Sequence, residues 1–478
     1  MLRVAGESKP GSLLNIETVI AANRFGLGAK PGELQQVDRD PKGWLLGQLA
    51  GPSRLPAAVR QLPDTASVLR EVQEVRQMRR DARRTLDDEP APDVVQKFGA
   101  IVRRHYLEQT AAKFRVASST DFPFHERLVG FWANHFAVSA DKQPVSAVAG
   151  LFENEAIRPN LSGRFVDLLL AVEKHPAMLL YLDNQRSIGP NSTLAKRANR
   201  QQRDQQVGLN ENLAREILEL HTLGVDGGYS QQDVTSFARV ITGWSIGGGE
   251  QRRFTQGTPG TFEFHESIHE PGSQSILGNR YGQNGISQGE AVLRDLATHP
   301  STAHFVATKL VRHFVADSPP PGMVDGIAEV FLETGGDLSS VHAALVNASE
   351  PWQSTFAKYK TPQDFVISAF RAFDRVPDNG RFVVGALDMM GQTPFRPGSP
   401  AGWPDTAGHW GGADSLYKRI EWANTVALHA GSRVNPLQLA DAVLGPALGD
   451  HTRTAISRAA SAAQGITLFL ASPEFQRR

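Results

Sequence analysis

A mainly α protein is predicted, with a bundle-like body of many helices and a small β or loop excursion near residues 247–285. Apolar residues recur at helical spacing along most of the 478 residues. Runs that alternate apolar and polar residues between turn residues are scarce. The exception is the stretch Gly247–Gly285, rich in Gly, Thr, Ser and Phe, in which Thr261–Phe264 alternates as a strand does.

The first region, residues 1–120, is expected to be helical and to carry a long helical arm. Val68, Val72 and Val75 step along a charged helix, which the run Asp87–Pro90 stops. The helix that follows it is expected to pack against it as an antiparallel pair, a role that needs no chemistry. The helices predicted here are Ile16–Phe25, Pro41–Ala50, Asp64–Thr85 and Pro92–Val116.

The central region, residues 121–285, combines helices with the β excursion. Between Asn184 and Asn210 lies a polar stretch with several Arg and Lys residues but a single acidic residue, Asp204. This stretch is typical of a mobile loop or lid with some helix, or of a solvated surface insertion. The helices predicted here are His125–Phe136, Asn160–Glu173, Pro176–Leu182 and Asn210–Leu223.

The last region, residues 286–478, returns to helical periodicity from Ser287 onward. The stretch Gly391–Trp403 is too rich in Pro and Gly for regular structure, so it is expected to be an ordered loop or a linker. The further helices predicted here are Ala303–Val315, Met323–Glu333, Leu338–Ala348, Pro362–Phe373, Ser415–Ala430, Pro436–Leu444 and Ala455–Leu470.

Composition excludes several function classes. Lys plus Arg and Asp plus Glu both number 50, so no net charge attracts nucleic acid or an anionic membrane. There is no Cys, which excludes disulfides, thiol nucleophiles and iron–sulfur clusters, and any metal ligands must be His or carboxylate. No apolar run approaches the roughly 20 residues of a membrane span. Met1–Pro10 lacks the apolar core of a secretory signal, so the sequence as it stands predicts a cytoplasmic protein.

The predicted helix Asn210–Leu223 carries both a charged face and a histidine. Asn210 stands where an N-cap belongs. Glu211, Arg215 and Glu219 follow at a spacing of four, which predicts an ion-pair ladder along one face. His221 falls among the apolar residues of the other face, as a core histidine or as a ligand.

Two further histidines extend this pattern. His135 falls on the apolar face of His125–Phe136, and burying an imidazole without a partner costs about 1–3 kcal/mol. Each of these histidines should therefore meet an acceptor, a titratable group or a metal. His269 and Glu270 belong to a His/Glu cluster that is weak as a metal motif by itself. It is credible as a loop that contributes one His and one carboxylate to a site built by the two helices.

Other signals are weaker. Trp244 ends a helical segment either as a packing residue or as a platform for substrate, and His304 and His313 are expected at the surface of their helix. Neither a phosphate-binding glycine loop with Lys and Ser or Thr nor a nucleophile elbow is present.

The sequence resembles the large bacterial family catalogued as DUF1800, whose function is unknown. The resemblance covers nearly the whole chain in the family's order. The matching blocks are Asn23–Gly28, Phe131–Phe136, Pro176–Asn184, Asn210–Gly224, Tyr229–Val234, Ala238–Trp244, Lys360–Pro362 and Ser399–Trp403.

The resemblance implies a helical bacterial protein, and members often carry an export signal and are often encoded beside a sulfatase-like family, DUF1501. Since no such signal is recognised here, export with a signal-bearing partner to the periplasm or cell exterior is the alternative to a cytoplasmic location. The family usually has His-Asp where this chain has His269 and Glu270, a carboxylate longer by one methylene. No established catalytic residue carries over from the family.

The leading expectation is an enzyme, hydrolytic or group-transferring, that acts on a bacterial envelope or extracellular substrate such as a polysaccharide. Its chemistry would run either through a water on a divalent metal or through a carboxylate pair without metal. The expected metal ligands are His135, His221 and His269. The expected acid–base or supporting groups are Glu211, Arg215, Glu216 and Glu270, and the expected substrate contacts are Trp132, Asn134, Asp183, Asn210 and Trp244.

Two other function classes fit the same residues. In a non-catalytic binding or assembly protein that works with a DUF1501-type partner, the charged ladder is a strut and the histidines are core residues. In a redox protein, the histidines hold iron or copper.

Overall fold

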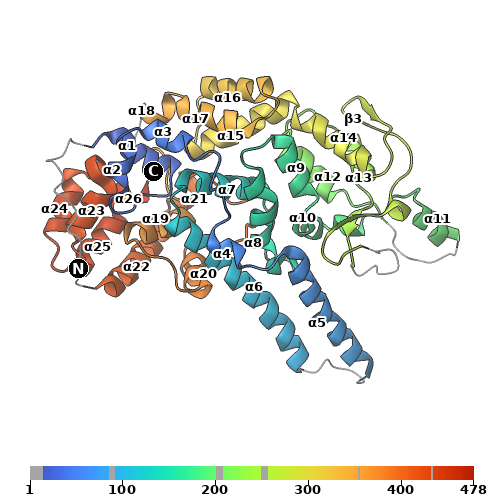
Figure 1. Cartoon of the computed structure of the whole chain (residues 1–478), viewed down its shortest axis with the longest axis horizontal. Helices are drawn as coiled ribbons and strands as arrows, with labels where there is room; N and C mark the ends of the chain where they lie inside the picture. Colours follow the sequence, from blue (N-terminus) through green and yellow to red (C-terminus); the bar gives the residue numbers. More distant parts are fainter. Residues whose placement is uncertain (1–13, 86–91, 201–207, 249–256, 354–355, 432–433) are drawn as a thin grey trace.

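The computed structural model describes residues 14–85, 92–200, 208–248, 257–353, 356–431 and 434–478. The chain is mainly helical, as the sequence predicts, and the described residues form two small sheets of two strands each (Figure 1). None of the helices in this described part is long and apolar enough to cross a bilayer.

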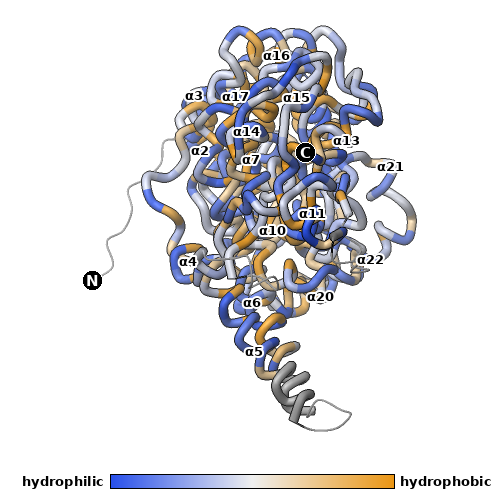
Figure 2. Tube along the Cα trace, turned by 90° about the vertical axis from the view of Figure 1, so that its right-hand side faces the viewer, coloured by the Kyte–Doolittle hydropathy of each residue, from blue (hydrophilic) through white to orange (hydrophobic). Residues whose placement is uncertain are grey.

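The N-terminal helices confirm the predicted arm. Helices α5 and α6 pack side by side and project from the body in both views (Figures 1 and 2). Val68, Val72 and Val75 are buried along α5. The stop predicted at Asp87–Pro90 lies outside the described residues. The helices are α1 (Ile16–Ile20, continued by a π-helical turn Ala21–Phe25), α2 (Glu33–Val37), α3 (Pro41–Leu46), α4 (Ala57–Arg60), α5 (Thr65–Thr85) and α6 (Pro92–Ser119).

Two of the central helices are clearly shorter than predicted. The helix expected from Asn160 begins only at Phe165, because residues 158–160 form a 3-10 turn. The helix expected over Asn210–Leu223 changes to a π-helical turn at Ile217–His221. The helices are α7 (Pro123–His135), α8 (Ala149–Phe152), α9 (Phe165–Glu173), α10 (Pro176–Tyr181), α11 (Thr193–Arg200), α12 (Asn212–Glu216) and α13 (Gln231–Val240).

The β excursion is present. Strand β1 (Trp244–Ile246) pairs antiparallel with β2 (Phe262–Phe264), so that Trp244 lies opposite Phe264. Strand β3 (Gln274–Ile276) pairs antiparallel with β4 (Asn279–Tyr281). The predicted strand at Thr261–Phe264 is therefore confirmed to within one residue.

Most of the predicted C-terminal helices are present. Helix α20 and the short helices α18, α21 and α26 were not predicted. The single helix predicted at Ala455–Leu470 is wrong, because Ser461 accepts a hydrogen bond from the Gln464 backbone and starts a new helix there. The helices are α14 (Ile286–Ala297), α15 (Pro300–Phe314), α16 (Pro321–Glu333), α17 (Leu338–Asn347), α18 (Glu350–Gln353), α19 (Pro362–Ala372), α20 (Gly380–Met389), α21 (Ala407–Trp410), α22 (Ala413–Ala430), α23 (Pro436–Leu444), α24 (Asp450–Ser457), α25 (Ala462–Ala471) and α26 (Pro473–Gln476).

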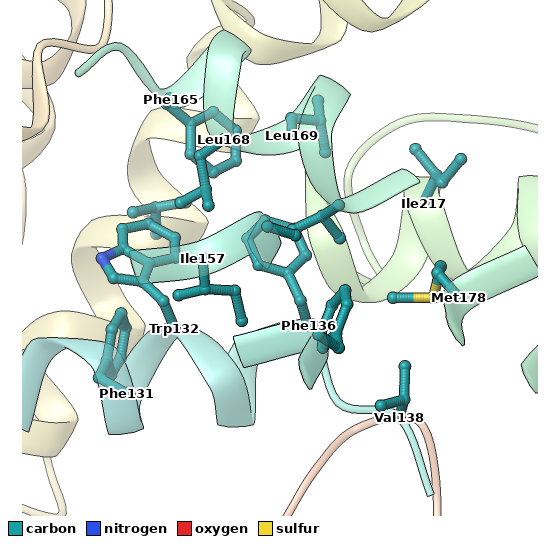
Figure 3. Close-up of a cluster of buried hydrophobic side chains, with 14 of the residues drawn as sticks. Phe131, Trp132, Phe136, Val138, Ile157, Phe165, Leu168, Leu169, Met178 and Ile217 are labelled. Carbon is teal, nitrogen blue, oxygen red and sulfur yellow. The ribbon is translucent and has the colours of Figure 1, made fainter. Parts of the chain in front are cut away.

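The apolar interior consists of one large and one smaller main cluster. The large one draws on helices from α1 to α17, and Figure 3 shows its aromatic part, where Trp132, Phe136 and Phe165 pack against one another. The smaller one is built mostly from residues 365–475. The clusters thus divide near residue 350, whereas the sequence divides the chain at residues 120 and 285. Because a cluster boundary does not by itself define a domain, the three regions remain a prediction.

Candidate functional site

Two of the predicted metal ligands meet in the core. His221 is fully buried, and its Nδ1 lies 2.8 Å from Oε1 of Glu173, which is buried as completely. Nε2 of His135 lies 3.1 Å from the backbone oxygen of His221. Each imidazole therefore finds a hydrogen-bond partner, as the cost of burial requires.

The third predicted ligand lies in a different contact. Nδ1 of His269 is 2.8 Å from the backbone oxygen of Thr242, and its ring packs against Phe264. Within the described ranges, no three His, Asp or Glu side chains are grouped so that they could hold a metal ion. The predicted site of His135, His221 and His269 is thus not assembled, because each imidazole is directed to a separate acceptor. The redox alternative lacks a donor set in the same residues.

The predicted acid–base groups form local structural contacts. The guanidinium of Arg215 lies 3.2 Å from Glu211 and 3.5 Å from Glu219, which confirms the ion-pair ladder. A hydrogen bond from the Thr235 hydroxyl, with further bonds from Gln231, lowers the pKa of Glu211. Burial raises the pKa of the half-buried Glu216.

Glu270 is buried and binds a neighbouring loop. Its carboxylate accepts hydrogen bonds from the backbone N–H of Asn191 at 2.7 Å and from its side-chain amide at 2.6 Å. Because both of its oxygens are engaged by one residue, the carboxylate holds the segment before α11 in place.

The two tryptophans predicted as stacking walls are core residues. Trp132 and Trp244 have no exposed surface, so neither indole face is open to a ligand, and this prediction is wrong. The strands and helices around them close over both rings.

Three of the residues predicted to contact substrate instead make contacts with neighbouring segments of the chain. Asn134 donates to the backbone oxygen of Trp403 at 2.9 Å and accepts from its N–H at 2.7 Å. Asp183 pairs with Lys142 at 2.5 Å. Asn210 lies one residue before the N-cap of α12 and accepts from the backbone N–H of Asn212 at 2.9 Å.

The hydrogen bond between Trp132 and His342 predicts how the stability of the protein depends on pH. The indole N–H of Trp132 donates to Nε2 of His342 at 3.3 Å, so this nitrogen must be unprotonated. Burial lowers the pKa of His342 from 6.5 to about 3. Between pH 6.5 and about 3, His342 is protonated in the unfolded chain but not in the folded one. The stability that depends on a neutral His342 is therefore complete above pH 6.5 and is lost as the pH falls. The free energy of unfolding should drop between pH 6.5 and 4.5 by about 2–3 kcal/mol more in the wild type than in His342→Gln.

Urea denaturation of both proteins at the two pH values measures this difference. Glutamine offers an amide oxygen to the same N–H but does not titrate, so equal pH dependence in the two proteins would contradict the assignment.

A polar cavity of about 100 Å³ lies where α7, α15, the start of α19 and the loop before α21 meet. A volume of this size admits several water molecules or one small chemical group. Its walls combine apolar side chains with charged groups that come from several separate segments of the chain. The polar and aromatic residues that line it include Lys113, Glu126, Arg127, Asn134, Glu153, His313, Thr361, Gln363, Asp364, Gln392, Trp403 and Asp405.

A histidine–aspartate pair stands in this cavity wall. Nδ1 of His313 lies 2.5 Å from Oδ2 of Asp405, and both side chains are largely buried. Burial would raise the pKa of Asp405, but His313, Lys358 and Arg478 together hold it below its usual value. Burial lowers the pKa of His313. The carboxylate is thus ionised and the imidazole neutral at pH 7, with the proton on Nδ1.

This tautomer leaves a lone pair on the other ring nitrogen. Nε2 of His313 is buried and has no hydrogen-bond partner among the residues that the structure describes. An imidazole oriented by a carboxylate, with a lone pair that no other group uses, is the arrangement that a general base requires, and His313 lines this cavity.

Arginines complete the charge balance. Nη1 of Arg127 lies 3.2 Å from Asp364, and its Nε donates to the backbone oxygen of Gly26 at 2.5 Å. Its Nη2 is buried without a hydrogen-bond partner in the described part of the chain. Arg478 lies between the two carboxylates, 3.3 Å from Asp364 and 3.6 Å from Asp405. Of these two arginines only Arg127 lines the cavity, and its Nη2 is the donor there that no described residue uses.

The sequence did not single out this site, and the surface placement predicted for His313 is wrong. Its position beside Phe314 on a helix gave no sign of a buried partner, because Asp405 lies 92 residues away. One signal was available: the blocks Phe131–Phe136, Lys360–Pro362 and Ser399–Trp403, which carry the family resemblance, all contribute to the cavity wall. His304, nine residues earlier on α15, is exposed, which confirms the surface position predicted for it.

Comparison with known proteins gives one match. A family model described as "Protein of unknown function (DUF1800)" matches residues 20–477. No curated protein and no solved structure matches the chain.

Proposed function

Because the chain belongs to the DUF1800 family, whose function is unknown, we propose from its own geometry that it is a hydrolase. The catalytic cavity is the one lined by Arg127, His313 and Asp405. The observation that carries the proposal is the His313–Asp405 pair at 2.5 Å, whose free Nε2 belongs to a residue of the cavity wall.

In this proposal His313 is the general base. A water molecule that donates to Nε2 becomes a nucleophile as the imidazole takes its proton, and Asp405 stabilises the imidazolium that forms. The same proton then passes to the leaving group. The cavity residues Thr361 and Asn134 are not nucleophiles in this scheme, because each is already engaged, Thr361 as the cap of α19 and Asn134 by Trp403.

Charge balance indicates the substrate class. The free N–H of Arg127 suits an oxygen that becomes negative only in the transition state. Because the lining has two basic side chains, Lys113 and Arg127, against four carboxylates, the cavity favours a neutral reacting group over a phosphate dianion. The carboxylates are those of Glu126, Glu153, Asp364 and Asp405. A carboxylic ester meets both conditions, and its reacting end fits a volume of about 100 Å³.

This proposal keeps the hydrolytic expectation and moves it to other residues. A polysaccharide as the carrier of the ester, an envelope location and a DUF1501-type partner remain predictions that rest on the resemblance. The rival class, a binding or assembly protein, predicts a folded protein that hydrolyses no ester.

Hydrolysis of a series of nitrophenyl esters with acyl chains of two to eight carbons, with nitrophenyl phosphate alongside, tests the proposal. We expect ester hydrolysis whose kcat/KM rises with pH and reaches a plateau. The fall on the acid side should lie below pH 6.5, because burial keeps the pKa of His313 below that value. Turnover of the phosphate alone, or no ester turnover above the buffer rate by a folded protein, would contradict it.

A further inference from the structure

A second, larger cavity lies at the base of the arm. It occupies about 630 Å³ between α6, α20 and the loops at residues 140–146 and 393–396. This volume is in the range of sites that hold small organic ligands. The proline-rich loop separates it from the smaller cavity, since Arg396 lines the larger one and the adjacent Phe395 lines the other.

Three arginines from three separate segments line the larger cavity. Arg103 on α6 and Arg381 on α20 are exposed at its rim and make no side-chain hydrogen bond or ion pair with any residue in the described ranges. Arg396 lies over the ring of Tyr106 and 3.7 Å from the exposed Asp141. Guanidinium groups with unused donors are suited to an anionic ligand.

The same wall also offers acceptors and an unused hydroxyl. Asp141 and Asp388 both line it, and Asp388 accepts from the hydroxyl of Thr393 at 2.7 Å. Ser146 is 94% buried, as only 6% of its surface is exposed, yet its hydroxyl has no hydrogen-bond partner in the described part of the chain. Such a group in a cavity wall is satisfied when a ligand or water supplies the partner.

Glycines keep both helical walls open. Gly99 on α6 and Gly385 on α20 line the cavity, and a Cβ added at either would meet no atom within 4 Å. Both glycines are exposed, so neither helix narrows the cavity at these positions.

We propose that this cavity binds an organic anion that also carries hydroxyl groups, as uronic acids and sugar phosphates do. Arg103, Arg381 and Arg396 hold the anionic group, while Asp141, Asp388 and the Ser146 hydroxyl bond to the hydroxyls. The inference is independent of ester hydrolysis in the smaller cavity, because it concerns other side chains and is tested by binding alone.

Isothermal titration calorimetry of the full chain with trigalacturonate, glucose 6-phosphate and maltotriose tests it. We expect one or both anions to bind and the neutral trisaccharide to bind at least tenfold more weakly. Whichever anion binds more tightly identifies a carboxylate or a phosphate as the source of the charge. Equal affinity for maltotriose, or no binding of either anion, would overturn the proposal.

Matched variants locate the binding. The double variant Arg103→Gln, Arg381→Gln should weaken binding at least tenfold, whereas the exposed Arg458→Gln should not. Gly385→Phe should block the cavity, while Gly326→Phe, on a helix with equally open space, is its control. Thermal melting checks that each variant is folded, and unchanged affinity in both cavity variants would overturn the assignment.

Discussion

Replacing His313 with glutamine is expected to lower kcat/KM for ester hydrolysis by about 10²–10⁴-fold, the usual contribution of a general base. Glutamine fills much of the same space and can still meet Asp405, 2.5 Å from the imidazole, but it cannot accept a proton from water. The loss should therefore appear in kcat, with little change in KM or in the melting temperature. Initial rates over the ester series measure this loss. Stopped reactions at high enzyme concentration extend the measurement to the slow rates expected of the variant.

His304→Gln is the matched control, since this exposed histidine lies on the same helix and outside the cavity. It should keep the wild-type rate. If both variants retain full activity, or if His313→Gln loses activity only in proportion to unfolded protein, His313 is not the base. Residual activity whose acid limb has disappeared would instead agree with the assignment, because the titrating group has gone.

Replacing Arg371 with alanine is expected to lower the free energy of unfolding by about 3–5 kcal/mol. Arg371 is fully buried, and its Nη2 contacts both carboxylate oxygens of Glu33 at 2.9 Å. It also donates to the backbone oxygen of Gly28 at 2.6 Å and to those of Ala117 and Thr120. Removing the guanidinium leaves three carbonyls without this donor and the buried carboxylate with the Lys30 backbone N–H, at 2.8 Å, as its remaining donor. Urea denaturation followed by far-UV circular dichroism measures the change.

Arg375→Ala is the control for this prediction, because Arg375 is exposed just beyond the end of the same helix. It should change stability by less than about 0.5 kcal/mol. Adding Glu33→Gln to Arg371→Ala should recover part of the loss, since it removes the uncompensated charge. A single variant as stable as Arg375→Ala would show that the buried pair contributes nothing net.

The Arg371 contact also explains one block of the family resemblance. Gly28 has a φ of 95°, a conformation that disfavours a side chain, and a Cβ there would lie 2.9 Å from the Ser368 hydroxyl. The block Asn23–Gly28 is thus fixed by α19, whose sequence lies more than 300 residues away. Short-range patterns carry no information about such a contact.

Helix positions were largely predictable because they depend on nearby residues. The apolar spacing of Val68, Val72 and Val75 is enough to place α5, and Pro436 and Leu444 bound α23 as predicted. The errors arose where a cap or a turn type decided the outcome, as at Ser461 and at the π-helical turn Ile217–His221.

The sequence predicted which kinds of residue are buried and need partners, but not which of them come together in one site. The sequence indicated that His135 and His221 would be buried and would need partners, and they are. It joined them to His269 in one metal site, whereas in the described part of the chain each of the three imidazoles contacts a separate acceptor. It also placed His313 at the surface. Helical periodicity gives the face on which a side chain lies but not the element that covers that face.

The amino-acid sequence alone therefore determined the mainly α class, the arm of α5 and α6, the β excursion and the ion-pair ladder of Glu211, Arg215 and Glu219. All of these follow from residue patterns within one segment or between segments adjacent in the chain. Only the tertiary structure decided the cavity in which His313 meets Asp405 and Arg127 meets Asp364. The physical reason is that burial and partner choice depend on residues 92 and 237 positions apart, which come together only when the helices pack.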